Sequence, residues 1–155
     1  MVGRVLGDVA HILVETPDGS WRLDETILFE LDGQWIQLFV DVGGQSWKRV
    51  SKDAVDIPGD YEDLVAHHIE SSKVVATPTM VRTVTEFAAA GGKVIACEVE
   101  LAQGGFAITM DPEDCVILKQ GEARRYCEQV AAPQIGPLSV RSRTAAQQTV
   151  EADGG

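Results

Sequence analysis

The chain has 155 residues, of which 45% are hydrophobic, and a formal net charge of −11. This composition is typical of one globular domain, and the lack of an apolar run of about 18 residues excludes a membrane-spanning helix. The negative charge disfavours binding to nucleic acid or to an anionic membrane and favours association with a basic partner. Because the first residues lack the long apolar region of a signal peptide, we expect a cytoplasmic protein.

The negative charge is concentrated in the first part of the chain. Residues 122–155 contain four arginines and four carboxylates, so residues 1–121 carry the whole net charge. We expect residues 1–121 to form a single β-rich domain, and residues 122–155 to form a short helix and then a flexible tail. The tail is predicted because the residues beyond Pro133 offer too little apolar surface to offset the entropy lost on ordering.

Residues 25–40 predict a β-hairpin with a defined register. The Asp32-Gly33 dipeptide suits a two-residue type I′ turn, in which both residues need a positive φ. A two-residue loop fixes the partners across the hairpin, so that apolar side chains pair on one face. The apolar pairs on this face are Phe29 with Ile36 and Ile27 with Leu38.

The opposite face of this hairpin is more aromatic than a solvated surface requires. Trp35 and Phe39 lie on it among polar neighbours, so we expect either another layer or a partner to cover it. All three tryptophans fall in the first half of the chain, and an aromatic patch rimmed by carboxylates is typical of a protein-binding surface. The remaining side chains of this face are Leu28, Glu30 and Gln37.

The alternating pattern around the hairpin predicts two β-meanders. Turn signals such as Thr16–Ser20 and residues 42–45 separate the strands of the first meander. Together the meanders predict a mainly β fold of about eight short antiparallel strands, arranged as a sandwich or a small barrel. The expected strands are 9–15, 25–31, 35–40, 46–50, 80–87, 93–101, 106–110 and 115–119.

A short helix is predicted between the two meanders, over about residues 60–71. Asp60 suits the capping position, and apolar side chains recur at the spacing of one helical face. The residues of this face are Tyr61, Leu64, Val65, His68 and Ile69.

The second meander resembles the first when the chain is shifted by 70 positions, which suggests two repeats over about 9–50 and 79–120, joined by a linker at 51–78. In the second hairpin, a four-residue loop would place Leu101 opposite Phe106, with Val99 opposite Ile108 and Cys97 opposite Met110. The other face of this hairpin is expected to be solvated, and it carries Glu98, Glu100, Ala107 and Thr109.

No linear motif for catalysis, phosphate binding or calcium binding is present. His67 and His68 would diverge on a helix, and three cysteines without C-x-x-C spacing do not predict a zinc site or a disulfide framework. We therefore predict no catalytic residue, no metal and no cofactor. An acidic cluster is instead predicted to bind a cationic partner, and its members are Asp53, Asp56, Asp60, Glu62 and Asp63.

These features favour a non-enzymatic protein-binding module that contacts a basic protein through Trp35, Phe39 and the acidic cluster, in the manner of an inhibitor or immunity protein. One alternative is a β-barrel or sandwich that holds a small ligand or performs simple chemistry. A second alternative is a structural subunit that assembles with copies of itself through exposed strand edges. The residues identify no family.

Overall fold

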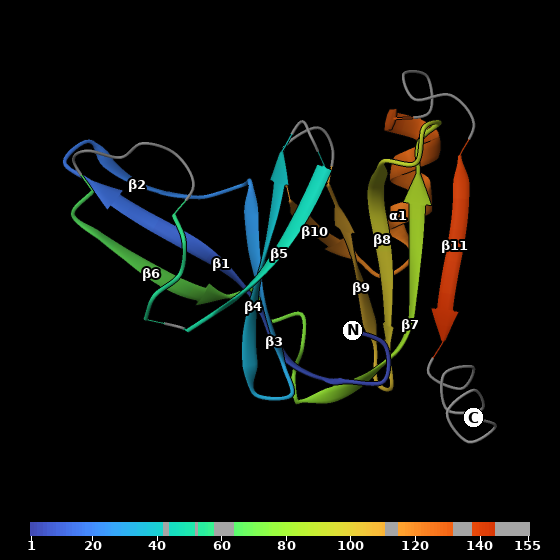
Figure 1. Ribbon diagram of the computed structural model, residues 1–155, viewed down its shortest axis with the longest axis horizontal. Helices are drawn as coiled ribbons and strands as arrows, with labels where there is room; N and C mark the ends of the chain where they lie inside the picture. Colours follow the sequence, from blue (N-terminus) through green and yellow to red (C-terminus); the bar gives the residue numbers. More distant parts are fainter. Residues whose placement is uncertain (42–43, 52, 58–63, 111–114, 132–137, 145–155) are drawn as a thin grey trace.

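The computed structural model describes residues 1–41, 44–51, 53–57, 64–110, 115–131 and 138–144. These residues form eleven strands, a short α-helix and a short π-helix (Figure 1). No described helix is long and apolar enough to cross a membrane. The elements are β1 Val5–Thr16, β2 Gly19–Arg22, β3 Thr26–Leu31, β4 Gln34–Asp41, β5 Gly44–Val50, β6 Ala66–Ser71, β7 Thr79–Ala88, β8 Val94–Leu101, β9 Gly105–Thr109, β10 Val116–Lys119, α1 Glu122–Tyr126, η1 Cys127–Ala131 and β11 Ser139–Thr144.

The strands form two antiparallel sheets that face each other (Figure 1). The first sheet contains β1–β6 and the second contains β7–β11, and they join where Val5 and Leu6 of β1 pair with Met80 and Thr79 of β7. The path of paired strands ends at β5 and β10, which do not pair with each other in the described residues. The mainly β prediction is thus confirmed, and the open sheets form a sandwich rather than a barrel.

The predicted meanders are present in both sheets. The order β1-β3-β4-β5 in the first sheet is matched by β7-β8-β9-β10 in the second, and the two meanders meet at β1 and β7. This arrangement is what two similar halves would give, but duplication of one ancestral unit stays a prediction.

The hairpin of β3 and β4 has the predicted turn and register. Asp32 has a φ of 50° and Gly33 a φ of 80°, as a type I′ turn requires. Phe29 lies opposite Ile36 and Ile27 lies opposite Leu38, and the face that they share is directed into the core. The two-residue loop therefore determines which side chains of this hairpin are buried.

The main core lies between the two sheets. Alternate residues of β3 and β4 meet alternate residues of β8 and β9 across this space, as in other sandwiches. Because both sheets supply its side chains, neither sheet buries this apolar surface alone. Its largest members include Leu6, Ile27, Phe29, Leu38, Phe106 and Ile108.

Two smaller cores cover the outer faces of the sheets. On the first sheet, Leu28 is fully buried and Trp35 packs against the same cluster, which also contains Val55 from the loop after β5. On the second sheet, α1 lies over β8 and β9, and Ala123 packs against Ala107. The second face of the β3–β4 hairpin is therefore covered by another layer of this chain, which was one of the two expectations for it.

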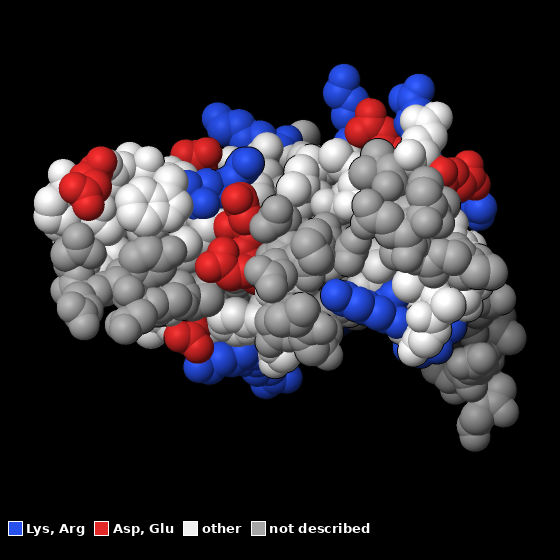
Figure 2. Space-filling view, turned by 90° about the horizontal axis from the view of Figure 1, so that it is seen from above, with Lys and Arg blue, Asp and Glu red and all other residues white. Residues whose placement is uncertain are grey.

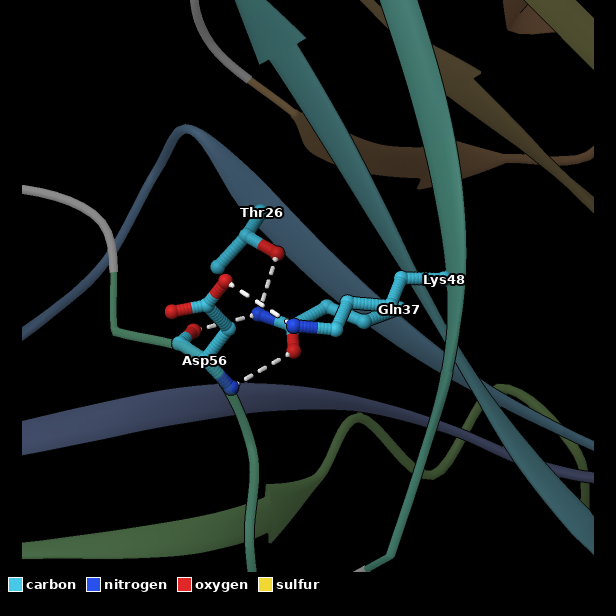
Figure 3. Close-up of polar contacts among 4 residues, drawn as sticks. All are labelled: Thr26, Gln37, Lys48 and Asp56. Atoms are coloured by element: carbon cyan, nitrogen blue, oxygen red, sulfur yellow. Dashed lines mark hydrogen bonds and ion pairs between the residues drawn. The ribbon is translucent and has the colours of Figure 1, made fainter.

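Gln37 connects the loop that carries Val55 to the first sheet (Figure 3). Its side chain is fully buried, and its Nε2 donates hydrogen bonds to the Thr26 hydroxyl at 2.9 Å and to the Asp56 carbonyl oxygen at 2.6 Å. Its Oε1 accepts a hydrogen bond from the Asp56 N–H at 2.9 Å. The amide thus pairs with the backbone of Asp56 as a neighbouring strand would, and it fixes the loop over the outer core.

The predicted helix at 60–71 is wrong for residues 66–71, which form β6, while residues 60–63 lie outside the described part. β6 pairs with the second half of β1, and Ile69 lies opposite Ile12. This half of β1 extends beyond β3, so β6 satisfies its backbone groups. Pairing with β1 here outweighs the local helical spacing, because tertiary contacts readily override such weak preferences.

The predicted register of the second hairpin is wrong by two residues. Val99, not Leu101, lies opposite Phe106, and the Leu101 N–H donates a hydrogen bond to the Gly104 carbonyl oxygen at 3.0 Å. The loop is therefore shorter than predicted, with a positive φ of 83° at Gly104 that glycine adopts without strain. A shift of two residues preserves the face of every side chain, so the predicted inward residues are still the buried ones.

The outer face of this second hairpin is only partly solvated. Glu100 is exposed, but Ala107 is fully buried and Thr109 is 4% exposed. The prediction of a solvated face fails at these two positions. At Ala107 the reason is that a small side chain allows Ala123 of α1 and Cys127 of η1 to pack closely on the sheet.

The predicted flexible tail is wrong for residues 139–144, which form β11 along β7. Pairing at a sheet edge is made by backbone groups, and it does not require the apolar side chains whose scarcity suggested a tail. The expected short helix is confirmed as α1. Residues 133–137 and 145–155 lie outside the described part.

Candidate functional site

A partly open cavity of about 260 Å³ lies between the two sheets, and we call it the inter-sheet cavity. Phe29 and Trp47 line it from the first sheet, with their ring centroids 5.6 Å apart and the rings inclined at 45°. Trp47 is 51% exposed, so its ring lies between the cavity and solvent. The second sheet supplies the facing wall, which includes Val84, Cys97, Val99, Ile108 and Met110.

Two charged residues of the second sheet also line the inter-sheet cavity. Glu86 lies on β7, and its carboxylate is 3.1 Å from the guanidinium of Arg141 on β11. Arg143 lies two residues further along β11, opposite Val84. The cavity therefore combines an apolar interior with charged groups along one side, which is the usual composition of a small-molecule site.

Cys97 is the thiol that lines the cavity, and it is 7% exposed. Burial raises the pKa of this thiol to about 12, and the nearby Glu86 carboxylate adds to the effect. The thiol is therefore neutral at physiological pH, whereas nucleophilic cysteines need the thiolate. Cys97 forms part of the apolar wall and has no character of a nucleophile.

The predicted partner-binding residues lie partly together. Trp35 is close to the loop at residues 53–57, which carries Asp53 and Asp56. Trp35 is half-buried and packs on the same outer core as Val55, while Phe39 is half-buried. Asp53 and Asp56 are exposed on the loop. The other members of the acidic cluster, Asp60, Glu62 and Asp63, lie outside the described residues.

The expected acidic surface is interrupted by basic side chains. The acidic cluster contains no basic residue of its own. Lys48 of β5 nevertheless lies 3.4 Å from the Asp56 carboxylate and forms an ion pair with it. On the face seen in Figure 2, carboxylates and basic side chains lie beside one another rather than in separate patches. Such mixed charge is typical of a solvated surface.

Among the described residues, the three histidines are not part of a cluster of metal-binding side chains. His67 and His68 are neighbours on β6, where successive side chains point to opposite faces, and the His68 Nε2 lies 3.1 Å from the Glu15 carboxylate. His11 on β1 is 5% exposed, and no hydrogen-bond partner is found for its Nδ1 among the described atoms. Within the described ranges, no group of three His, Cys, Asp or Glu residues could hold a metal ion.

A sandwich that holds a small ligand was one alternative from the sequence, but the position and the lining of the inter-sheet cavity were not predicted. The alternation of Phe29, Val99 and Ile108 indicated core positions, but a cavity depends on how two sheets far apart in sequence approach each other. No sequence pattern indicated a role for Arg143, because this residue lies in the segment expected to be a flexible tail. Comparisons with protein-family models, with characterised proteins and with solved structures gave no match, so a function for this chain has to be inferred from its own geometry.

Proposed function

We propose that the protein binds a small apolar molecule in the inter-sheet cavity. The observation that carries this proposal is the opposition of Phe29 and Trp47 to the aliphatic wall of the second sheet around about 260 Å³ of space. An apolar cavity of roughly 150 Å³ in another protein stays dry and binds benzene. The inter-sheet cavity is larger and has an apolar interior with charged groups along one side, so it can hold a molecule of moderate size.

Titration with 1-octanol, followed by calorimetry, tests this function directly. We expect saturable binding to the wild-type chain, because transfer of an apolar chain from water into apolar surroundings is favourable. A Val84→Phe variant places a ring in the cavity and should weaken binding about tenfold or more. Val140→Phe is the matched control, since Val140 lies on the neighbouring strand β11, is 42% exposed and does not line the cavity.

A lack of saturable 1-octanol binding to the folded wild-type chain would overturn the proposal. Equal weakening by Val84→Phe and Val140→Phe would also contradict it, because the site would then not be the inter-sheet cavity. Circular dichroism of each variant establishes that the comparison is made between folded proteins.

A protein-binding module is the second candidate, and the half-exposed Trp47 on β5 is the observation that favours it. Exposed tryptophans are enriched among the residues that contribute most to binding energy at protein interfaces. A purified basic partner should bind less tightly to Trp47→Ala and to the double variant Asp53→Asn, Asp56→Asn. Unchanged affinity for both variants would remove the basis for this candidate.

A further inference from the structure

The edge of the second sheet brings three charged side chains to the face that lines the inter-sheet cavity. Side chains directly opposite each other on paired strands project to the same face of a sheet. Arg141 lies opposite Glu86 and Arg143 lies opposite Val84, and both Glu86 and Val84 line the cavity. The inner face of this sandwich is thus apolar over β8 and β9 but charged along β7 and β11.

The charges on this edge do not cancel. Arg141 pairs with Glu86 through its Nη2, at 3.1 Å from Oε2. Arg143 is exposed and lines the cavity, and among the described residues no carboxylate lies within ion-pair distance of its guanidinium. Among the described residues, one Glu and two Arg side chains therefore leave one net positive charge on this edge of the cavity.

We infer that the inter-sheet cavity takes an amphipathic monocarboxylate, with its apolar body between the sheets and its carboxylate on Arg143. This inference rests on the proposed function and adds the charge of the ligand to it. The planar guanidinium can donate two parallel hydrogen bonds to a carboxylate, which a lysine cannot match. A cavity of about 260 Å³ holds roughly eight or nine groups the size of a water molecule, so a medium-chain acid suits it.

Inward-pointing charges on an edge strand also have a purely structural use. They prevent the free edge from pairing with another sheet, and such a device would act without any ligand. The two roles differ in what they predict, because an edge-protecting Arg143 gives no preference between a carboxylate and a neutral head group.

The experiment compares octanoate with 1-octanol, which share the alkyl chain and differ in charge. We expect the wild-type chain to bind octanoate more tightly. Arg143→Gln should weaken octanoate binding about fivefold and leave 1-octanol binding within twofold, because a solvent-exposed ion pair contributes up to about that factor. Arg82→Gln is the matched control: it removes the same charge from the exposed part of β7, outside the cavity lining.

Two further measurements sharpen the comparison. Glu86→Gln should tighten octanoate binding about twofold or more, because it removes a negative charge from the described lining of the cavity. A comparison of octylammonium with octanoate requires no substitution in the protein. The wild-type chain should bind octylammonium at least fivefold more weakly than octanoate. This second measurement keeps the inference testable if a substitution at the sheet edge disturbs folding.

The outcomes separate the inference from the function on which it rests. Saturable binding of 1-octanol with equal affinity for octanoate and octylammonium would overturn the role of Arg143 and leave the apolar cavity as a binding site. The same conclusion holds if Arg143→Gln and Arg82→Gln weaken octanoate binding equally. Absence of binding for all three probes would overturn the proposed function together with the inference.

Discussion

At the scale of single residues, Gln37 shows how one buried amide can hold a loop in place. Replacement by Leu keeps the volume but leaves the Thr26 hydroxyl and both backbone groups of Asp56 without the partners that Gln37 provides. Leaving such groups unpaired costs about 1–3 kcal/mol each when they are buried. Because Asp56 is partly accessible to water, we expect Gln37→Leu to lower the free energy of unfolding by about 2–3 kcal/mol in total.

Urea denaturation at pH 7 measures this change in the free energy of unfolding. Gln34→Leu is the matched control, since Gln34 lies on the same strand, is exposed, and should change stability by no more than about 0.5 kcal/mol. A Gln37→Leu variant as stable as Gln34→Leu would show that these hydrogen bonds do not hold the loop.

We expect the stability of the molecule to depend on pH through His11. Burial is the main cause that lowers the pKa of its imidazole below the ordinary 6.5, and the nearby Arg22 adds to it, while Asp24 and Glu70 oppose it. Below pH 6.5 the unfolded chain therefore binds a proton at His11 more readily than the folded chain does. It follows that the contribution of His11 to the free energy of unfolding falls as pH decreases below this value.

His11→Leu removes this titration, so the variant should lose less stability than the wild type between pH 7 and pH 5. Urea denaturation of both proteins at the two pH values gives the comparison. Equal losses in the two proteins would contradict the assignment of this pH dependence to His11.

At the scale of elements, the attachment of α1 depends on one carboxylate from the sheet beneath it. The Glu98 side chain on β8 accepts hydrogen bonds from the N–H of Gly121 at 3.0 Å and of Ala123 at 2.7 Å. These N–H groups lie at the start of the helix, where the N-cap residue is Gly121 and no side chain of that residue can cap them. Glu98 therefore serves as a helix cap from a distant part of the chain.

We expect Glu98→Ala to destabilise the attachment of α1 by about 1–2 kcal/mol, the usual cost of a lost cap. Cys127 is fully buried directly after α1, so its labelling by a thiol reagent reports on local opening. Labelling should become about tenfold faster in the variant, as a change of about 1.4 kcal/mol implies. Glu100→Ala on the same strand is the control, and equal rates in both variants would contradict the capping role.

Elements with strong local signals could be predicted from the sequence, and elements defined by their neighbours could not. The turn residues Asp32 and Gly33 and the alternation around them determined the register of β3 and β4 correctly. β6 and β11 were missed because each lies along a strand distant in sequence, β1 and β7, and carries no clear alternation of its own. For the same reason the role of Glu98 had no sequence signal, although the residue itself was placed on the correct strand.

At the scale of the whole molecule, the sequence predicted which side chains point inward but not the space that remains between the sheets. The alternation of apolar and polar residues along the strands correctly predicted the burial of four side chains, Phe29, Leu38, Phe106 and Ile108. The inter-sheet cavity depends on the separation of the sheets and on β11, which adds Arg143 to one side. Such properties come from the packing of distant segments, and no single stretch of the chain encodes them.

The shared core also predicts that the two sheets unfold together. All three tryptophans lie in the first sheet, on β2, β4 and β5, whereas Phe106 lies on β9 of the second sheet and is 1% exposed in the core between them. Phe106→Leu should lower the free energy of unfolding by about 1–2 kcal/mol, because it leaves a space among side chains from both sheets. Tryptophan fluorescence and far-ultraviolet circular dichroism should show the same shifted midpoint.

Val116→Ala, at an exposed position of β10, should leave the midpoint almost unchanged. A tryptophan transition that keeps its wild-type midpoint while circular dichroism shifts would mean that the two sheets are separate folding units, contrary to the single core that joins them.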